Sequence, residues 1–229
     1  MTPFIRTEMR LADVILQDPS IIPVINRFGI KLGLGDKSIA TICEETDVDN
    51  TFFVAILNTY IHSNYLPVEQ FSTAYASEVI AYLRKTNSSY ERFLLPNIER
   101  HLNSFIERSD PANANLKLLK QFFNLFKAEL LQRIEKDNDF TFPHLIELSH
   151  NSKAMSVSLD SAYNEEDSIA EKLTDIKRIM VIHLNGAYDE NLCFAVLTAI
   201  CNLEKDIHQH NRIRNKILFP FTQALHNLQ

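Results

Sequence analysis

The stretch LKLLKQFFNLFKAELLQRIEKD, residues 116–137, decides the fold of this chain. Its apolar residues recur at spacings of three and four, which is the period of an amphipathic helix. The apolar stripe consists of Leu119, Phe122, Phe123, Phe126 and Leu130. The stretch therefore predicts a long helix over residues 116–140, with one face buried in a core.

The same period continues on both sides of this helix. It predicts further long helices over residues 71–106, 165–184 and 192–219. Residues 109–111 and the pair Asn185-Gly186 are typical helix stops, and the Ser-rich residues 149–161 predict a loop. Long helices joined in two hairpins favour an antiparallel four-helix bundle.

Shorter helices are predicted before the bundle, within residues 11–65. Asp18-Pro19-Ser20 is a start signal for the first, and Asp36 or Ser38 is a suitable cap for the second. A third follows the turn at residues 47–50. We therefore expect an all-α protein with a small three-helix module over residues 1–66 and a bundle over residues 67–229.

Composition limits the classes of function. The chain has 229 residues, of which 45% are hydrophobic and 23% charged, which is typical of a globular protein. The net charge of −6 argues against non-specific nucleic-acid binding, which needs a basic surface. The 3 Cys form no Cys-x-x-Cys pair, which favours a reducing compartment. Neither a leader-like N-terminus nor a stretch long enough to span a membrane is found, so we expect a cytoplasmic protein.

Polar residues interrupt the apolar stripes near one end of each long helix. They are Asn87 with Ser88, Arg133 and Asp137, Glu166, and His210 and Arg214. Charged residues are costly to bury unless they are paired or bind a ligand. Some helical bundles place His and carboxylate side chains at such positions to hold a di-iron centre.

A simpler interpretation of the same residues is surface decoration. The apolar pattern of a helix often stops before the helix does, so polar residues near its end are commonly exposed. Arg133 with Asp137 would then form an exposed ion pair worth about 0.3–0.5 kcal/mol. No Gly-rich phosphate loop, nucleophile elbow or HExxH motif offers another site. The sequence pattern alone leaves both interpretations open.

The second and fourth helices also share a weak internal repeat. The spacing of Arg133, Asp137 and Phe142-Pro143 in the second helix equals that of His210, Arg214 and Phe219-Pro220 in the fourth. Two related hairpins would place these polar pairs opposite each other in the bundle.

Four segments resemble a known family. Residues 11–15 (LADVI), 25–30 (INRFGI), 165–177 and 207–220 resemble the iron–sulfur cluster repair di-iron proteins, a hemerythrin-like family linked to nitric-oxide and oxidative stress. The resemblance covers almost the whole chain. It implies a hemerythrin-like bundle behind a small helical module, and a dimer.

The resemblance also implies where metal ligands would lie. Three of the family's His ligands fall on other residues here: Asn87 or Ser88, Arg133, and Glu166. The fourth His is unchanged as His210. The two Glu ligands fall on Asp137 and Arg214. The family's Cys-Cys pair in the N-terminal module falls on Gly33 and Leu34.

The two arginines argue against a di-iron centre, because a guanidinium stays protonated and has no lone pair to donate. We expect no cofactor; if a metal binds, iron held by His210, Asp137 and Glu166 is the candidate. Alternatively, Arg133 and Arg214 replace the metal charge, with Asp137 and Glu166 as their partners. That hypothesis requires these side chains to be buried.

Three functions follow as expectations. The first is a degenerate, non-catalytic member of the family that acts in protein interaction or regulation. The second is a metal protein with a residual mononuclear site. The third is a working repair factor that pairs with an intact paralogue. A homodimer or a heterodimer with a paralogue, and a protein partner, are expected; nucleic acid and membrane are not.

Overall fold

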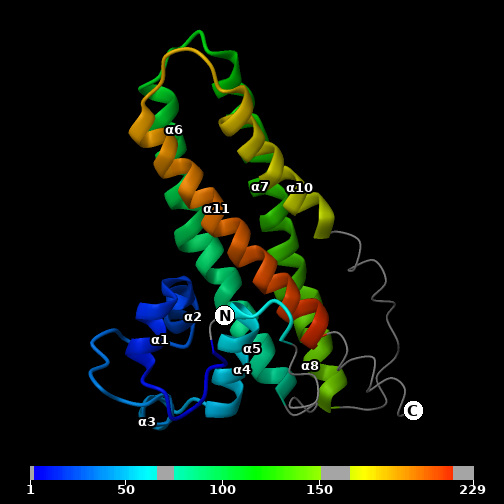
Figure 1. Cartoon of the computed structure of the whole chain (residues 1–229). Coiled ribbons are helices and arrows are strands. Elements are labelled where there is room, and N and C mark those ends of the chain that lie inside the picture. Colours follow the sequence, from blue (N-terminus) through cyan, green and yellow to red (C-terminus); the bar gives the residue numbers. More distant parts are fainter. Residues whose placement is uncertain (1–2, 66–74, 151–165, 219–229) are drawn as a thin grey trace. The chain divides into compact units, whose positions relative to one another are not determined.

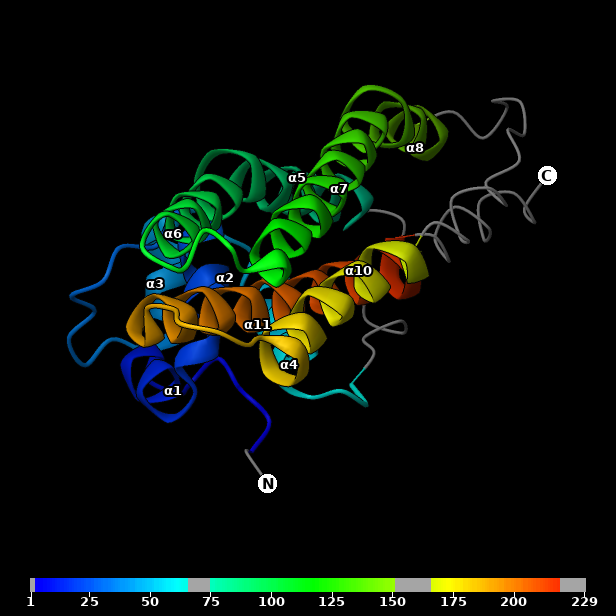
Figure 2. The same cartoon turned by 90° about the horizontal axis from the view of Figure 1, so that it is seen from above.

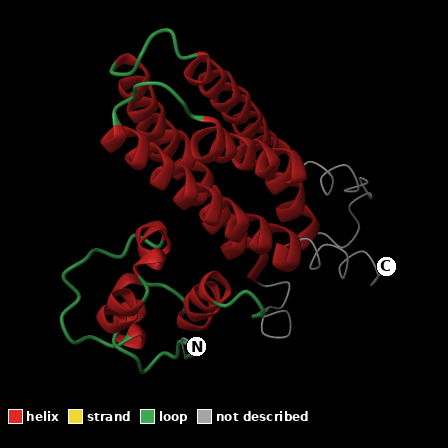
Figure 3. Ribbon diagram, turned by 45° about the horizontal axis from the view of Figure 1, so that its top comes forward, coloured by secondary structure: helices red, strands yellow, loops and turns green. Residues whose placement is uncertain are grey.

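The computed structural model of the chain describes residues 3–65, 75–150 and 166–218, and the side chains at 148, 150, 166–168, 216 and 217 are left out of this description. These residues form helices joined by loops, and no strand occurs among them (Figure 3). The prediction of an all-α protein is therefore confirmed. None of the helices within these ranges is long and apolar enough to cross a membrane.

The chain divides into two compact units. The terminal unit comprises Met1–Lys85 and Arg212–Gln229, and the bundle unit comprises Thr86–Asn211. The terminal unit is thus built from both ends of the chain. The predicted boundary between residues 66 and 67 lies outside the described residues and stays a prediction.

The bundle unit contains two antiparallel hairpins. The first joins α6 (Leu95–Glu107) to α7 (Ala114–Lys136), and the second joins α10 (Glu166–Arg178) to α11 (Glu190–Ile213). The four lie side by side in both views (Figures 1 and 2).

Ion pairs join neighbouring helices of the bundle unit. Glu99 of α6 pairs with Lys127 of α7 at 2.6 Å, and Lys177 of α10 pairs with Glu204 of α11 at 2.5 Å. Lys172 of α10 also pairs with Glu129 of α7.

The loops of both hairpins meet at one end of the bundle unit, shown at the top of Figure 1. The Asp110 N–H donates to the Ala187 carbonyl at 3.0 Å, and the Asp189 N–H donates to the Ser109 hydroxyl at 3.4 Å. The Asn113 amide also donates to the Asn185 carbonyl. These contacts close that end, so the helix ends carrying Arg133 and His210 lie together at the other.

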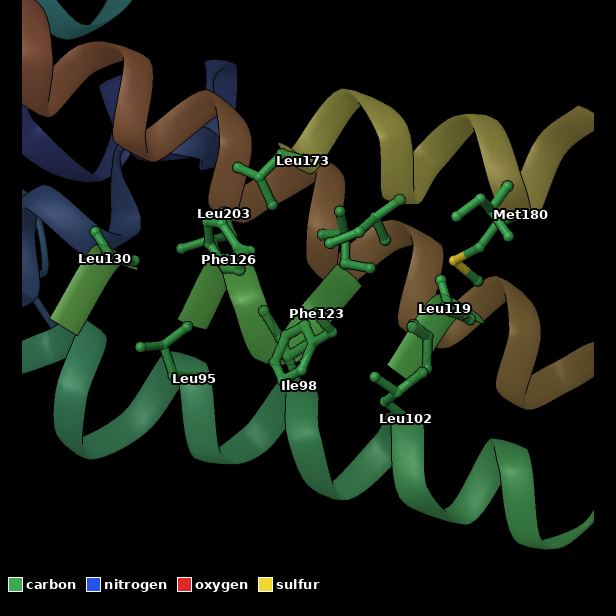
Figure 4. Close-up of a cluster of buried hydrophobic side chains, with 14 of the residues drawn as sticks. Leu95, Ile98, Leu102, Leu119, Phe123, Phe126, Leu130, Leu173, Met180 and Leu203 are labelled. Carbon is green, nitrogen blue, oxygen red and sulfur yellow. The ribbon is translucent and has the colours of Figure 1, made fainter. Parts of the chain in front are cut away.

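The interior of the bundle unit is apolar along its length. Figure 4 shows Leu95, Ile98 and Leu102 of α6 facing the stripe of α7, with side chains from α10 and α11 above them. The predicted stripe residues Leu119, Phe123, Phe126 and Leu130 of α7 are fully buried, and Phe122 packs at the edge. Each fully buried side chain of this size contributes about 1.5–3 kcal/mol through the hydrophobic effect, so this stripe stabilises the bundle unit substantially.

Each long helix of the bundle passes through one π-helical segment. These are η3 (Tyr90–Leu94) between α5 (Ala76–Ser89) and α6, η4 (Asp137–Thr141) between α7 and α8 (Phe142–His150), η5 (Ile179–His183) and η6 (Arg214–Leu218). The Leu95 N–H donates to the Tyr90 carbonyl, and the Phe142 N–H donates to the Asp137 carbonyl. A proline follows each of these donors, and proline cannot make the ordinary helical hydrogen bond.

Two boundaries predicted for the second long helix are wrong for this reason. The helix does not end near residue 140, and residues 149 and 150 are helical where a loop was predicted. The wider turn of η4 carries the chain past Pro143 without a break. The rest of the predicted loop lies outside the described residues.

The terminal unit contains short helices with the predicted starts. They are α1 (Leu11–Gln17), η1 (Pro19–Ile21), α2 (Ile22–Arg27), α3 (Ile39–Thr46) and α4 (Asn50–Ile61). The Asp18 side chain accepts from the Ser20 N–H and Ser38 accepts from the Thr41 N–H, as predicted for caps. The prediction did not include α1.

Contacts distant in sequence hold the terminal unit together. The buried Asn58 amide pairs with Ile5, accepting from its N–H at 2.8 Å and donating to its carbonyl at 3.0 Å. Arg212 donates to backbone carbonyls at the end of α4, including Thr59 at 2.7 Å and Ser63 at 2.7 Å. The last residues described are thus part of the same unit as the first.

Candidate functional site

A layer of buried polar side chains lies at the end of the bundle unit away from the hairpin loops. We call it the polar layer; it consists of Thr86, Asn87, Arg133, Asp137, Asp206, His210 and Asn211, none more than 9% exposed. The layer follows directly on the apolar stripe, because Arg133 and His210 stand in the last turns of α7 and α11.

Contacts between described residues join the helices across this layer. The Arg133 Nη1 donates to Asn211 Oδ1 at 3.1 Å, which links α7 to α11. The rings of Tyr90 and His210 lie 5.8 Å apart, which links η3 to α11. The Asn87 Nδ2 donates to Asn138 Oδ1 at 3.5 Å, which links α5 to η4.

Burial excludes the surface interpretation of these residues. Arg133 is 5% exposed and Asp137 is 1% exposed, so the two are not a solvated pair at a fraying helix end. Burying such charges costs several kcal/mol each unless other groups compensate. The layer is therefore a built feature of the bundle unit.

The structure describes the burial of some, but not all, of the other predicted positions. Glu166 is the first residue of α10, and its side chain lies outside the described residues. Ser88 is half-buried. Arg214 is 2% exposed at the start of η6, one helical turn after His210, and donates to Asn215 Oδ1 at 3.4 Å. The proposed pairing of the arginines with carboxylates stays a prediction.

The donor set of the polar layer does not fit a pair of iron ions. It offers the His210 nitrogens and the Asp137 and Asp206 carboxylates, but it also contains Arg133, whose permanent positive charge repels a metal ion. Within the described side chains, no group of three or more His, Cys, Asp or Glu is arranged to hold a metal.

The positions matched to the family's Cys pair lie in the loop between α2 and α3. Gly33 is exposed and has a φ of +91°, a conformation in which a residue with a side chain is strained. Leu34 is half-buried. The loop conformation therefore suits the glycine that this sequence has and disfavours a cysteine at position 33.

A cavity of about 330 Å³ opens beside the polar layer, between α7 and α10. It is lined by Glu129, Gln132, Arg133, Lys136 and Ile169. Its charged side chains have both signs, and Glu129 is already bound by Lys172. The lining therefore selects no ligand class.

Sequence reasoning missed part of the polar layer. Asp206 lies one turn before His210 on the same helix face, so the extension of the stripe that found His210 also indicates Asp206. Asn138 and Asn211 lie beside the predicted Asp137 and His210, a position off the stripe that the pattern does not mark. Only the packing of the helices identifies these two amides.

Comparison with known proteins gives one consistent similarity. No family model matches the chain. Two curated proteins, each named "Iron-sulfur cluster repair protein ScdA" and from different strains of Staphylococcus epidermidis, are 20% identical to it over 221 residues. The match covers 91% of this chain and 95% of each relative. The chain is thus distantly similar, over nearly its whole length, to an iron–sulfur cluster repair protein.

Proposed function

We propose that the chain is a degenerate member of the iron–sulfur cluster repair family that acts as a non-catalytic interaction or regulatory protein in the cytoplasm. The similarity to the two repair proteins supports the family. The observation that supports a loss of metal binding is the burial of Arg133 in the polar layer. The family resemblance implies a metal-binding His at this position.

A guanidinium at this position changes the role of its neighbours. It has five N–H donors and no acceptor, and it repels a dication. Arg133 holds Asn211, the residue beside His210, at 3.1 Å. In this proposal, arginine supplies the positive charge that stabilises the buried Asp137 and Asp206, and the layer stabilises the bundle without performing chemistry.

A helical protein without its metal-ligating residues still presents surfaces that other proteins can bind. We infer that those surfaces are its function, in a response to nitric-oxide or oxidative stress shared with its family. A dimer, either of this chain or with an intact paralogue, is part of the proposal.

The test is elemental analysis of untagged protein purified without chelators from iron-supplemented cells. We expect no stoichiometric metal in the folded wild type. We expect iron binding to rise in the double variant Arg133→His, Arg214→Glu, which restores two ligand positions. Two irons per wild-type chain would overturn the proposal and indicate a working di-iron protein.

A residual mononuclear site is the alternative, because His210 and Asp137 are both buried in the polar layer. Under this alternative the wild type carries one metal per chain. His210→Ala would then abolish binding, whereas His208→Ala, which changes an exposed histidine two residues away, would not. Recovery of an iron-loaded paralogue with this chain would instead support a working mixed dimer.

A further inference from the structure

The single Asn-Gly pair of the chain, Asn185-Gly186, lies in the loop between η5 and α11. Both residues are exposed to solvent, and neither belongs to a helix. Gly186 has a φ of +76° and no side chain to shield its amide nitrogen. This nitrogen can therefore approach the Asn185 side chain more closely than the nitrogen of any residue with a Cβ.

Two hydrogen bonds hold the loop on either side of Gly186. The Asn113 Nδ2 donates to the Asn185 carbonyl, and the Asp110 N–H donates to the Ala187 carbonyl at 3.0 Å. Neither the Gly186 N–H nor the Asn185 side chain makes a hydrogen bond with any residue in the described ranges. The loop backbone is thus held in place, while the two groups that would react with each other stay available.

The Asn113 contact also favours a charged form of this peptide group. Loss of the Gly186 amide proton gives an anion whose negative charge lies largely on the Asn185 carbonyl oxygen. A hydrogen-bond donor directed at an oxygen that gains negative charge stabilises it. Asn113 is 6% exposed and its Oδ1 accepts from the Asn115 N–H at 3.0 Å, so its Nδ2 is oriented towards this carbonyl in advance.

We propose that Asn185 is a site of spontaneous deamidation, which Asn113 accelerates and for which water is the co-reactant. The Gly186 nitrogen loses its proton and attacks Asn185 Cγ. A C–N bond forms, the Cγ–Nδ2 bond breaks, and ammonia leaves with the proton, so that a five-membered succinimide remains. Water then adds to one of the two ring carbonyl carbons and breaks the bond of that carbon to nitrogen, which regains a proton. The net change is the gain of water and the loss of ammonia, with no oxidation or reduction.

The two ring carbonyls give different products. Opening at Cγ gives aspartate. Opening at the former main-chain carbonyl gives isoaspartate, in which the chain passes through Cγ and a free carboxylate replaces the carbonyl that Asn113 holds. Either product adds a negative charge at the closed end of the bundle unit, which also carries Asp110 and Asp189 (Figure 1). Deamidation therefore loosens the contact between the two hairpin loops. Neither metal nor partner takes part, so this chemistry goes beyond the proposed function and does not depend on it.

The test is a time course of the folded wild type at mildly alkaline pH, analysed by peptide mapping and mass spectrometry. Deamidation raises the mass of a peptide by about 1 Da, and fragmentation distinguishes isoaspartate from aspartate. Asn103 is the internal reference, because it also precedes a small residue but lies inside α6, where the next N–H is bound within the helix. We expect Asn185 to react at least about tenfold faster than Asn103, which must wait for local opening of its helix.

Asn113→Asp tests the role of the donor. Its carboxylate still accepts from the Asn115 N–H, so the helix cap remains, but it has no donor for the Asn185 carbonyl. We expect this variant to slow deamidation about tenfold in the folded protein, which corresponds to the loss of one hydrogen bond to a charged group. In urea, where the contact is absent, wild type and variant should react at equal rates. Circular dichroism confirms that the variant is folded without urea.

Asn115→Asp is the matched control. It adds the same charge in the same turn of α7, but the Asn115 amide donates to the His183 carbonyl and does not contact Asn185. It should change the rate less than about twofold, because solvent and salt screen the added charge. Asn185→Gln, which cannot form a five-membered ring, should abolish isoaspartate at this position.

Three results would overturn the proposal. The first is an Asn185 that stays unmodified in the folded protein or reacts no faster than Asn103. The second is equal slowing by Asn113→Asp and Asn115→Asp, which would make charge the cause. The third is a rate that is unchanged or faster in Asn113→Asp, because loop mobility and not the donor would then govern the reaction.

Discussion

A guanidinium buried at the end of α7 determines what the polar layer can do. Arg133 is oriented by Asn211 and lies one turn before the buried Asp137. Neither lysine nor histidine would serve equally, because arginine keeps its charge on burial and presents several donors in one plane. The residue is therefore better suited to hold polar neighbours together than to coordinate a metal.

Replacing Arg133 should destabilise the protein. Arg133→Ala leaves the Asn211 acceptor without its donor and removes a cation from a layer with two buried carboxylates. We expect the free energy of unfolding to fall by about 3 kcal/mol, measured by urea denaturation. Arg133→Met, which keeps the side-chain bulk, should recover little of this loss if charge and hydrogen bonding dominate.

The matched control for Arg133 is Lys117→Ala, which removes an exposed cation from the same helix. It should change the free energy of unfolding by no more than about 0.5 kcal/mol. If Arg133→Ala were as mild as this control, the polar layer would not be a stabilising network.

The three cysteines should differ in reactivity. Burial, with a smaller contribution from Asp49, raises the pKa of the Cys43 thiol from 9.0 to about 11. Burial also raises the pKa of Cys193, whereas Cys201 is exposed. Because the thiolate is the nucleophile, alkylation of the native protein near pH 8 should modify Cys201 first, as mass spectrometry of timed samples will show.

The raised pKa of Cys43 also predicts a pH dependence. The folded state keeps a proton that the unfolded state releases above 9.0, so this stabilisation is fully present below 9.0 and is lost as pH rises towards about 11. Cys43→Ala should flatten the decline in urea midpoint over that range. Equal labelling of Cys43 and Cys201 in the native protein would contradict the assignment.

At the scale of elements, π-helical segments explain both the success and the errors of the sequence pattern. The spacing of apolar residues predicted each long helix because most of its turns are regular. It missed η3 and η4 because a single wider turn leaves the three- and four-residue spacing on either side intact. The second long helix was predicted to end near residue 140, although a π turn there lets the helix continue.

A helix cap contributes to the closed end of the bundle unit. Asn113 is 6% exposed, accepts from the Asn115 N–H at 3.0 Å and donates to the Asn185 carbonyl of the other hairpin. Asn113→Ala should lower the free energy of unfolding by about 1–2 kcal/mol, measured by urea denaturation.

The control for the cap is Asn124→Ala in the exposed middle of α7. It should be neutral or slightly stabilising, because alanine has the higher helix propensity. A similar effect of the two substitutions would show that Asn113 contributes no more than an ordinary helical position.

At the scale of the whole molecule, the sequence predicted most of the elements, whereas the division between residues 66 and 67 stays a prediction. The all-α class and most helix starts followed from periodicity and caps. The polar layer was predictable where charged residues lie on an apolar stripe, as at Arg133 and His210. The contact of Arg212 with the end of α4 was not predictable, because its acceptors are backbone carbonyls, which every residue has.

Arg212 should therefore stabilise α4 from the far end of the chain. Its guanidinium donates to the carbonyls of Thr59, His62, Ser63 and Tyr65 at 2.7, 3.2, 2.7 and 3.1 Å. Burial lowers its pKa, yet an arginine stays charged at neutral pH, and a cation at a helix C-terminus is favourable. Loss of these contacts removes the guanidinium from the Thr59 carbonyl of α4 and from the carbonyls that directly follow the helix.

We expect Arg212→Ala to accelerate amide hydrogen exchange in peptides covering residues 50–65, while peptides from residues 114–136 keep their protection. Arg212→Lys should be intermediate, because an ammonium group cannot span the same carbonyls. Arg100→Ala, an exposed arginine of α6, provides the matched control and should leave α4 unchanged. If α4 exchanged at the same rate in wild type and Arg212→Ala, the N-terminal helices would be stable without the end of the chain. The terminal unit would then be a continuous module ending before the bundle, as the sequence alone predicted.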